Sequence, residues 1–409
     1  MQMLIFGSGT LLKNTLSNLL LTSQHSLQLL QRRRSARLKR KQKLQKLVMK
    51  MQATRDQQYN HQLIVLGRES RGISQSDMAK KLGFSQGKLS KVENGLLAVT
   101  DDEINLFSTI LSYPVHFFQR NEKVYGVGLS EFFHRKKQSV PQKQLMKIYA
   151  RLEIRRMEIH QLLKSVDIDE PNFPYMDPDK YSGDVELIAQ TIRAAWSLPR
   201  GPISNVIDVL EEAGAIVIPF DFEGANIDAI CLSHPGSPPL IFTNFDRPFD
   251  RIRFTLSHEL GHIIMHRRPP SEDTDIELQA DNFASEFLMP RQEIAPMLGN
   301  MTLPKLASLK PYWKTSMASL LVRAKDLGKI TERNYRYLWM QMGKSGYRTR
   351  EPEELDIPIE EPLTLKEILN VFKNDLKYSW KDLSSTIALN EMEFAHYYTP
   401  FEHRLRRVK

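Results

Sequence analysis

Apolar residues recur at helical spacing along most of the chain, and runs rich in β-branched residues occur between residues 215 and 243. Short periodic segments bounded by Ser and Gly fill residues 58–120, and a longer amphipathic segment follows within 121–180. Two further helical segments precede three strand-like runs, which read AIVIPFDF, DAICLS and PLIFTN. Helical spacing then returns. We therefore predict an α+β, multidomain chain: an all-α domain, then an α+β domain, then a helical C-terminal region.

Residues 254–266, FTLSHELGHIIMH, combine apolar helical spacing with the order H-E-x-x-H. In a helix of 3.6 residues per turn, His258 and His262 share a face about one turn apart, so both imidazoles can bind one metal ion. Glu259 lies beside that position, where a carboxylate can pass a proton from an attacking water to a leaving amine. With only 11 His in the chain, a chance match is expected roughly 2 times in 100. The pattern therefore indicates a metal site rather than ordinary packing.

A catalytic zinc ion takes three protein ligands and one open position, so a third ligand is needed. Residues 275–290, DIELQADNFASEFLMP, supply carboxylates on a second predicted helix. Glu277 and Asp281 share a face, so one can bind the ion while the other accepts the distal N–H of a ligand histidine. Glu286 points about 180° away from Glu277 and is the second choice. His266 repeats the four-residue spacing one turn further along, where a polar role at the helix end is expected.

Four short helical segments are predicted between residues 58 and 120, and helix-capping residues flank them. Ser74 and Ser85 are placed to cap the second and third segments, and Gly83 and Gly95 to end them. The three-residue break Gly-Phe-Ser between these two segments suits a helix-turn-helix. An all-α helix-turn-helix domain is therefore expected here.

The stretch RGISQSDMAKKLGFSQGKLSKVENG resembles the lambda-repressor-like (XRE) family of DNA-binding domains. The resemblance implies that Gln75 contacts a phosphate and that four residues of the recognition helix face the major groove, namely Ser85, Gln86, Lys88 and Ser90. Between residues 80 and 92 there are four lysines and no acidic residue, which suits contacts with DNA phosphates. The alternative is a helical bundle that only mediates pairing of two chains.

The stretch RFTLSHELGHIIMH, followed by ExxADNFASEFLMP, resembles the ImmA/IrrE family of metallopeptidase domains, which is often fused behind an XRE domain. The resemblance implies a gluzincin-like α+β domain with His258, His262 and Glu277 as metal ligands. Glu259 is then the general base, and Asp281 holds a ligand histidine in place. Zn²⁺ is the expected ion, and the same three ligands would also accept Mn²⁺, Fe²⁺ or Co²⁺.

The formal charge of +9 is concentrated in an N-terminal arm. Residues 1–55 hold 12 of the 57 basic residues and none of the 48 acidic ones, so the remaining chain is net −3. The basic tail at residues 31–50 has three possible roles: a nucleic-acid arm, a contact for an anionic membrane, or sequence with no folded role. We expect the last: residues 1–57 are a basic N-terminal extension, and with Met51 as the natural start residues 1–50 are not native.

The single cysteine, Cys231, excludes an internal disulfide framework and a multi-thiolate metal centre, so a reducing cytoplasm fits best. Because Cys231 lies in a predicted strand, inert packing is expected of it rather than nucleophilic chemistry. No uninterrupted apolar run reaches the ~18 residues that span a bilayer, so no membrane partner is expected.

Breaks in these patterns predict the domain boundaries. After the helix-turn-helix domain at 58–120, we expect a helical connector at 121–180 and a zinc metallopeptidase-like domain at 181–300. Residues 301–350 are expected to form a helical cap over the site. Residues 351–409 are expected to be an acidic linker and a small helical module, either a degenerate second helix-turn-helix or a dimer contact.

The preferred hypothesis is a DNA-binding transcriptional regulator with a zinc-dependent endopeptidase domain that cleaves a partner repressor or antitoxin. PLIFTN is the expected edge strand that holds the extended peptide. The alternatives are a non-catalytic repressor that uses the metal domain as a sensor or dimer module, and an antitoxin that binds its toxin through that domain. Glu259 favours the enzyme, because a sensor needs no carboxylate between its ligand histidines. The expected partners are a DNA operator, the protein substrate and a second copy of the chain.

Overall fold

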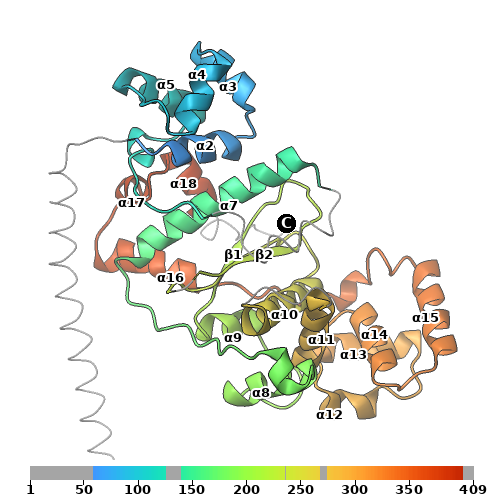
Figure 1. Cartoon of the computed structure of the whole chain (residues 1–409). Helices are drawn as coiled ribbons and strands as arrows, with labels where there is room; N and C mark the ends of the chain where they lie inside the picture. Colours follow the sequence, from blue (N-terminus) through green and yellow to red (C-terminus); the bar gives the residue numbers. More distant parts are fainter. Residues whose placement is uncertain (1–58, 126–139, 235, 268–273, 399–409) are drawn as a thin grey trace, which may run out of the picture. The chain divides into compact units, whose positions relative to one another are not determined.

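The computed structural model describes residues 59–125, 140–234, 236–267 and 274–398 (Figure 1). The chain divides into two units, Met1–Gln58 and Tyr59–Lys409. The predicted basic extension, residues 1–57, lies outside the described residues. The described helices and strands all belong to the second unit, which is α+β as predicted. Among the described residues, no helix combines the length and the apolar character needed to cross a bilayer.

Four short helices form the start of this unit, and polar side chains cap them. They are α2 (His61–Ser70), α3 (Gln75–Leu82), α4 (Gln86–Glu93) and α5 (Asp101–Leu111). The Ser74 side chain accepts the backbone N–H of Asp77 and caps α3, and Ser85 caps α4 in the same way. Gly83 ends α3 with a φ of 68°, a left-handed conformation that glycine adopts without steric cost. The predicted helix-turn-helix region is confirmed.

Three strands form a small mixed sheet in the order β1-β3-β2. The strands are β1 (Ile216–Pro219), β2 (Ala229–Leu232) and β3 (Leu240–Thr243). β3 runs parallel to β1, with Leu240 opposite Ile216, and antiparallel to β2, with Ile241 opposite Cys231. The expectation that PLIFTN forms an edge strand is therefore wrong, because this run is the central strand. All three runs are apolar and largely buried, so composition alone does not separate a central strand from an edge strand.

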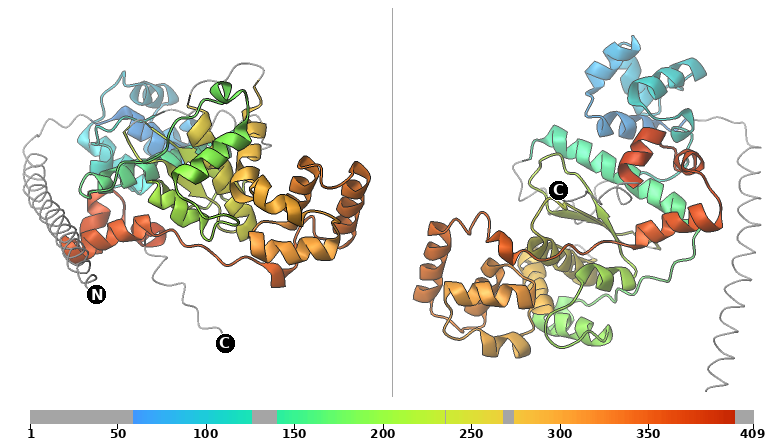
Figure 2. Two further views of the ribbon diagram at one scale, coloured as in Figure 1. Left: turned by 90° about the horizontal axis from the view of Figure 1, so that it is seen from below. Right: turned by 180° about the vertical axis from the view of Figure 1, so that it is seen from behind.

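Helices cover both faces of the sheet (Figures 1 and 2). Ile218 and Phe242 belong to an apolar cluster that includes residues of α7 (Gln142–Leu163). Their neighbours Val217 and Ile241 belong to a second cluster, with residues of α9 (Val206–Glu212) and α10 (Phe249–Met265). This is the two-residue alternation of a strand that is buried on both faces. α10, which carries the H-E-x-x-H motif, contacts β2 and β3.

The long helix α7 supplies the predicted connector region with a core. Its buried apolar residues include Ile148, Leu152, Met157, Ile159 and Leu162. The cluster to which they belong also contains residues of α2, α5, the sheet and the last helices of the chain. α7 therefore joins the helix-turn-helix region to the sheet through shared apolar packing.

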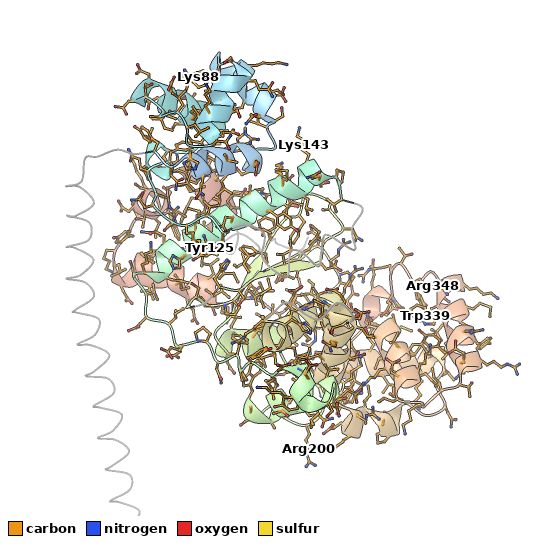
Figure 3. All side chains as sticks on the ribbon, viewed as in Figure 1. Lys88, Tyr125, Lys143, Arg200, Trp339 and Arg348 are labelled. Atoms are coloured by element: carbon orange, nitrogen blue, oxygen red, sulfur yellow. The ribbon has the colours of Figure 1, made fainter. Side chains whose placement is uncertain are left out.

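Helix α11 (Ile276–Leu288) lies alongside α10 and also contacts α8 (Val185–Ala195). The helical region predicted after residue 300 consists of α13 (Leu303–Trp313), α14 (Met317–Asp326) and α15 (Glu332–Lys344), and the short α12 (Arg291–Ile294) precedes it. Buried ion pairs attach this region to the motif helices: Lys310 of α13 pairs with Asp250 of α10, and Arg323 of α14 pairs with Glu286 of α11. Beyond α15, the guanidinium of Arg348 lies 5.4 Å from the Trp339 ring (Figure 3).

The acidic segment after α15, expected to be a linker, is anchored by two carboxylates. Glu360 pairs with the fully buried Arg253 of α10 and accepts the backbone N–H of Val206, at the start of α9, at 2.7 Å. Glu351 pairs with Lys310 at 2.7 Å. These acids are partners of buried cations, so this part of the chain is packed rather than a flexible linker. The acidic residues are evident in the sequence, but their pairing with cations far away in the chain cannot be predicted from it.

The C-terminal module consists of α16 (Thr364–Asn370), a π-helical turn (Val371–Asp375), α17 (Trp380–Thr386) and α18 (Glu391–Tyr398). Glu393 of α18 pairs with Arg71, which follows α2. The Asn390 amide donates to the carbonyl of Ser112 at 3.0 Å, and the Tyr398 hydroxyl donates to Glu158 of α7 at 2.8 Å. The module therefore contacts both α7 and the helix-turn-helix region of its own chain.

Candidate metal centre and DNA-binding helices

The H-E-x-x-H motif lies in the middle of α10, and the candidate carboxylates lie at the start of α11. Apolar residues hold α10 in place on its inner side, among them Leu256, Leu260 and Ile264. The side chain of Asp275 accepts the backbone N–H of Leu278 and caps α11, which fixes where that helix begins. Local helix geometry thus brings the two groups of polar residues to one side of each helix.

Three candidate ligand groups converge between α10 and α11. The Nε2 atoms of His258 and His262 lie 3.0 Å apart, and carboxylate oxygens of Glu277 lie 3.9 Å and 3.5 Å from them. These groups are half-buried and fall within 4.8 Å of one another. Ligand atoms about 2.0–2.2 Å from a tetrahedral ion are about 3.3–3.6 Å apart. The observed distances of 3.0, 3.5 and 3.9 Å lie within and on both sides of this range, so shifts of a few tenths of an ångström would bring all three groups onto one zinc ion. Two imidazole lone pairs 3.0 Å apart repel each other unless a proton or a metal cation lies between them.

Hydrogen bonds behind the two histidines orient their Nε2 atoms. Nδ1 of His258 donates to Oδ1 of Asp281 at 2.7 Å, so in the neutral ring Nε2 is the nitrogen without a proton. Nε2 of His266 donates to the Gln279 side-chain oxygen at 2.9 Å, so Nδ1 of His266 accepts from Nδ1 of His262 at 2.8 Å. The tautomers assigned in this way direct both Nε2 lone pairs toward the same position.

The surroundings shift the pKa values of two of these histidines in opposite directions. Burial lowers the pKa of His258, but the hydrogen bond with Asp281 and the charge of Glu259 outweigh it and hold the pKa above its ordinary value. Burial lowers the pKa of His266 below its ordinary value. A neutral His266 is what the hydrogen-bond chain to His262 requires.

Glu259 is buried, with 1% of its surface exposed. Burial raises the pKa of the Cys231 thiol well above its ordinary range, and the charge of Glu259 adds to this effect. Because the Glu259 charge acts on both Cys231 of β2 and His258, the carboxylate lies near both the strand and the ligand cluster. The raised pKa also keeps Cys231 protonated, which agrees with the expectation of an inert thiol.

Glu286, the second choice for the third ligand, lies elsewhere. It is fully buried, pairs with Arg323, and accepts the Gln190 amide at 2.8 Å and the backbone N–H of Arg291 at 3.1 Å. Its carboxylate therefore connects α11 to α8 and α14. This placement follows from its position on the opposite side of α11 from Glu277.

The residues expected to bind DNA differ in how accessible they are. Ser85 and Gln86, at the start of α4, are exposed. Gln75 is half-buried, and its amide donates to Glu93 at 2.8 Å, an acid that is itself paired with Arg68 at 2.6 Å. The Gln75 side chain is therefore oriented by a buried ion pair at the start of α3.

Lys88 and Ser90 lie further along α4, and both are half-buried. The Lys88 ammonium pairs with Glu103 of α5 and lies 3.9 Å from the centroid of the Phe84 ring. The Ser90 hydroxyl lies 3.4 Å from the Asn94 amide. The charge of Lys88 is therefore partly compensated inside the domain, and DNA contacts of these residues stay predictions.

Three contributors to the metal cluster were missed or only partly foreseen. Gln279 ends the hydrogen-bond chain behind His262, and nothing in its residue type marks that role. Gly261 lies between the motif histidines at the contact with α11. A glycine inside a helix costs about 1 kcal/mol relative to alanine, so its presence there is a sequence signal for close packing. His266 is expected to have a polar role at the helix end. Its four-residue spacing from His262 is the sequence signal that predicts contact between the two rings.

Two family models match the chain. Residues 66–118 match a helix-turn-helix family, and residues 210–325 match a peptidase family described as IrrE N-terminal-like domain. The second match contains α10 and α11, and its family is generally metal-dependent. A comparison with curated proteins gives no match. The chain is therefore a fusion of an XRE-type helix-turn-helix domain with a metallopeptidase-like domain of the ImmA/IrrE family.

Proposed function

We propose that this chain is a DNA-binding regulator that hydrolyses a peptide bond in a partner protein, with Zn²⁺ held by His258, His262 and Glu277. The observation that supports this most directly is the convergence of two oriented Nε2 atoms and a carboxylate near the buried Glu259. A zinc ion bound there supplies the Lewis acidity that polarises a carbonyl and activates water. Metal analysis separates zinc from Mn²⁺, Fe²⁺ and Co²⁺, which the same ligands accept.

The protein's own residues divide the remaining work. Glu259 takes a proton from the attacking water and delivers it to the leaving amine nitrogen. Asp281 and His266 are positioning residues, because they hold the imidazoles through Nδ1 and so keep the Nε2 lone pairs aligned.

β2 replaces PLIFTN as the candidate strand for substrate binding. It ends the sheet on one side and contacts α10. Cys231 within β2 is close enough to Glu259 for the glutamate charge to affect its pKa. An extended peptide added to this edge would be held by main-chain hydrogen bonds, with side-chain pockets setting the preference.

The DNA-binding part of the proposal rests on α3 and α4. We propose that α4 enters the major groove of an operator with Ser85, Gln86, Lys88 and Ser90, and that Gln75 lies near a phosphate. The proposed substrate is a partner repressor or antitoxin, and a homodimer would match a palindromic operator. A reducing cytoplasm suits a chain with a single cysteine.

Metal content and cleavage together test this function. The native protein is expected to bind about one zinc ion per chain. His258→Ala is expected to lose most of it, whereas His160→Ala, a histidine of α7 outside the cluster, retains it. Repressors and antitoxins encoded beside the gene are then incubated with native protein and with Glu259→Gln. Native protein should cleave a partner, and Glu259→Gln should bind metal without cleaving.

The outcomes separate the parts of the proposal. Cleavage that survives Glu259→Gln would contradict the role of that glutamate. Full metal retention in His258→Ala would contradict the site. Metal binding without cleavage of any partner would favour a non-catalytic repressor or antitoxin that uses the metal domain as a sensor or binding module.

A further inference from the structure

A cavity of about 310 Å³ lies where α2, α7, the loop after β1 and α18 come together. Arg71 lines it after α2, Arg151 and Arg155 line it from α7, Glu223 from the loop and Glu393 from α18. None of the metal-cluster residues is among its lining residues, so the cavity is separate from the candidate active site. Its volume is in the range of small-molecule sites.

Cationic side chains line one wall of the cavity at regular spacing. Lys147, Arg151 and Arg155 follow one another at four-residue intervals on α7, so they share a face of that helix. Arg71 adds a fourth cation from the helix-turn-helix region, and this one is paired with Glu393. Guanidinium and ammonium groups arranged together in this way match the oxygens of a phosphate group.

Arg155 carries a donor that the surrounding side chains leave unused. The residue is 5% exposed, its Nη1 donates to Glu158 at 3.0 Å, and its Cζ lies 4.1 Å from the centre of the Tyr398 ring. Its Nε is buried and has no hydrogen-bond partner among the described residues. Buried donors are nearly always paired, so an acceptor from a bound molecule would complete this group.

The carboxylate of Glu223 pairs with the other two cations of this wall, Lys147 and Arg151. Its two oxygens accept from Nζ of Lys147 at 2.7 Å, and one of them accepts from Arg151 at 2.8 Å. The backbone of Glu223 has a φ of 53°, in the left-handed region that side-chain-bearing residues rarely adopt. Strained residues of this kind collect at ligand sites. Because these ion pairs are partly exposed, they contribute little and a competing anion can displace them.

We propose that the cavity binds a phosphorylated small molecule whose phosphate replaces the Glu223 carboxylate on Lys147 and Arg151. A phosphate oxygen then also accepts from Nε of Arg155. Phosphate fits better than a carboxylate, because it offers three strong acceptor oxygens and up to two charges to three cationic side chains.

The body of the ligand is set by the remaining walls. Phe220 and Tyr397 line the cavity beside the cations, and the guanidinium groups of Arg151 and Arg155 lie 4.9 Å and 4.6 Å from their ring centres. A planar base packs against such guanidinium–aromatic pairs, which points to a molecule of nucleotide size. Such a ligand would touch the helix-turn-helix region through Arg71 and the metallopeptidase-like domain through the loop that carries Glu223.

Isothermal titration calorimetry on the full chain tests the proposal with four probes. Pyrophosphate and ADP present phosphate groups, adenosine lacks them, and tricarballylate is an anion without phosphate. We expect pyrophosphate and ADP to bind, and ADP to bind more tightly. Arg151→Gln should weaken both by at least about tenfold, since it removes a charge-assisted hydrogen bond. Glu223→Gln should strengthen both by about threefold, since it removes the internal competitor.

The two substitutions are expected to change ligand affinity in opposite directions. A folding defect would instead weaken binding in both variants, so the two explanations can be told apart. Glu332→Gln changes net charge by the same amount at an exposed residue of α15 outside the cavity and should leave affinity unchanged. Three results would overturn the proposal: no binding of ADP or pyrophosphate, equal affinities in all variants, or binding of tricarballylate as tight as that of the phosphates.

Discussion

Gly261 of α10 packs directly on Ala280 of α11, and a Cβ atom added at Gly261 would lie 3.3 Å from Cα of Ala280. Ala280 presents backbone at this point, which cannot rotate away as a side chain can. The contact therefore sets the distance between the helix with the two histidines and the helix with Glu277 and Asp281.

Replacing Gly261 with valine should push the helices apart and weaken metal binding. We expect a zinc affinity lower by about tenfold or more, since displaced ligands cost that much, and a stability loss of about 1–3 kcal/mol from overpacking. Competition with a chromogenic chelator and denaturant unfolding measure the two effects. Gly87→Ala is the matched control, because a Cβ at that helical position of α4 meets nothing within 4 Å. It should raise stability by up to about 1 kcal/mol and leave zinc affinity unchanged.

His266 should matter for metal affinity although it is not among the candidate ligands. His266→Leu removes the acceptor for Nδ1 of His262, so that ring loses both its tautomer and its orientation. Zinc affinity should fall by about 10–100-fold. Gln279→Glu keeps an oxygen acceptor for His266 and should retain most of the affinity. If His266→Leu binds zinc as tightly as native protein, the hydrogen-bond chain has no role in the site.

The pairing of Lys88 with Glu103 predicts a variant that binds DNA more tightly. Glu103→Gln frees the lysine for phosphate while keeping a side chain that can still complete the cap of α5. The salt dependence of operator binding should steepen by about one unit in log–log slope, and affinity at low salt should rise. Asp102→Asn removes an exposed acid from the same helix turn without freeing a lysine. A slope change in Asp102→Asn equal to that in Glu103→Gln would show a general charge effect instead.

The buried pair between Arg253 and Glu360 should be a large contributor to stability. Glu360→Ala leaves a fully buried guanidinium without its carboxylate and removes the acceptor for the first backbone N–H of α9. The free energy of unfolding should fall by about 3–5 kcal/mol. Glu361→Ala changes the neighbouring, exposed residue and should be nearly neutral. Equal losses in both variants would mean that the segment contributes through its backbone and not through this pair.

The acid dependence of stability should include Glu186. Burial raises the pKa of its carboxyl, but hydrogen bonds from Arg323 and Arg291 outweigh this and hold the pKa below its ordinary value. A lowered pKa means that the stabilisation is present above the unfolded-state pKa of about 4.3 and is lost as pH falls through the folded-state value. Glu186→Gln should therefore cost about 1 kcal/mol at pH 7 and progressively less below pH 4. Urea unfolding at several pH values measures this, and a cost that stays constant with pH would exclude an electrostatic origin.

Much of the candidate site was predictable because it depends on local geometry. Helical spacing alone puts His258 and His262 on one face of α10, and the same reasoning pairs Glu277 with Asp281 on α11. The gap between the two helices was not predictable, because it depends on how Gly261 fits against a residue of another helix. Spacing along one helix contains no information about its neighbour.

Errors arose where distant residues decide the structure. The central place of β3 results from pairing with residues 216–219, and the composition of each run is compatible with any order of the three strands. Local composition predicts a linker for the acidic segment after α15, because the partner of Glu360 lies 107 residues earlier in the chain. In both cases the deciding contact is long-range, and local patterns do not record it.

The apolar cluster that unites α2, α5, α7, one face of the sheet and the last helices also limits how such a protein can evolve. A recombination event that exchanged the helix-turn-helix domain alone would place the apolar residues of α7 and α18 against a surface whose side chains do not fit them. Ion pairs such as that between Arg71 and Glu393 would be lost with it. If α4 reads the operator as proposed, a new DNA specificity is acquired more readily by point changes on the exposed side of α4 than by transplanting the domain.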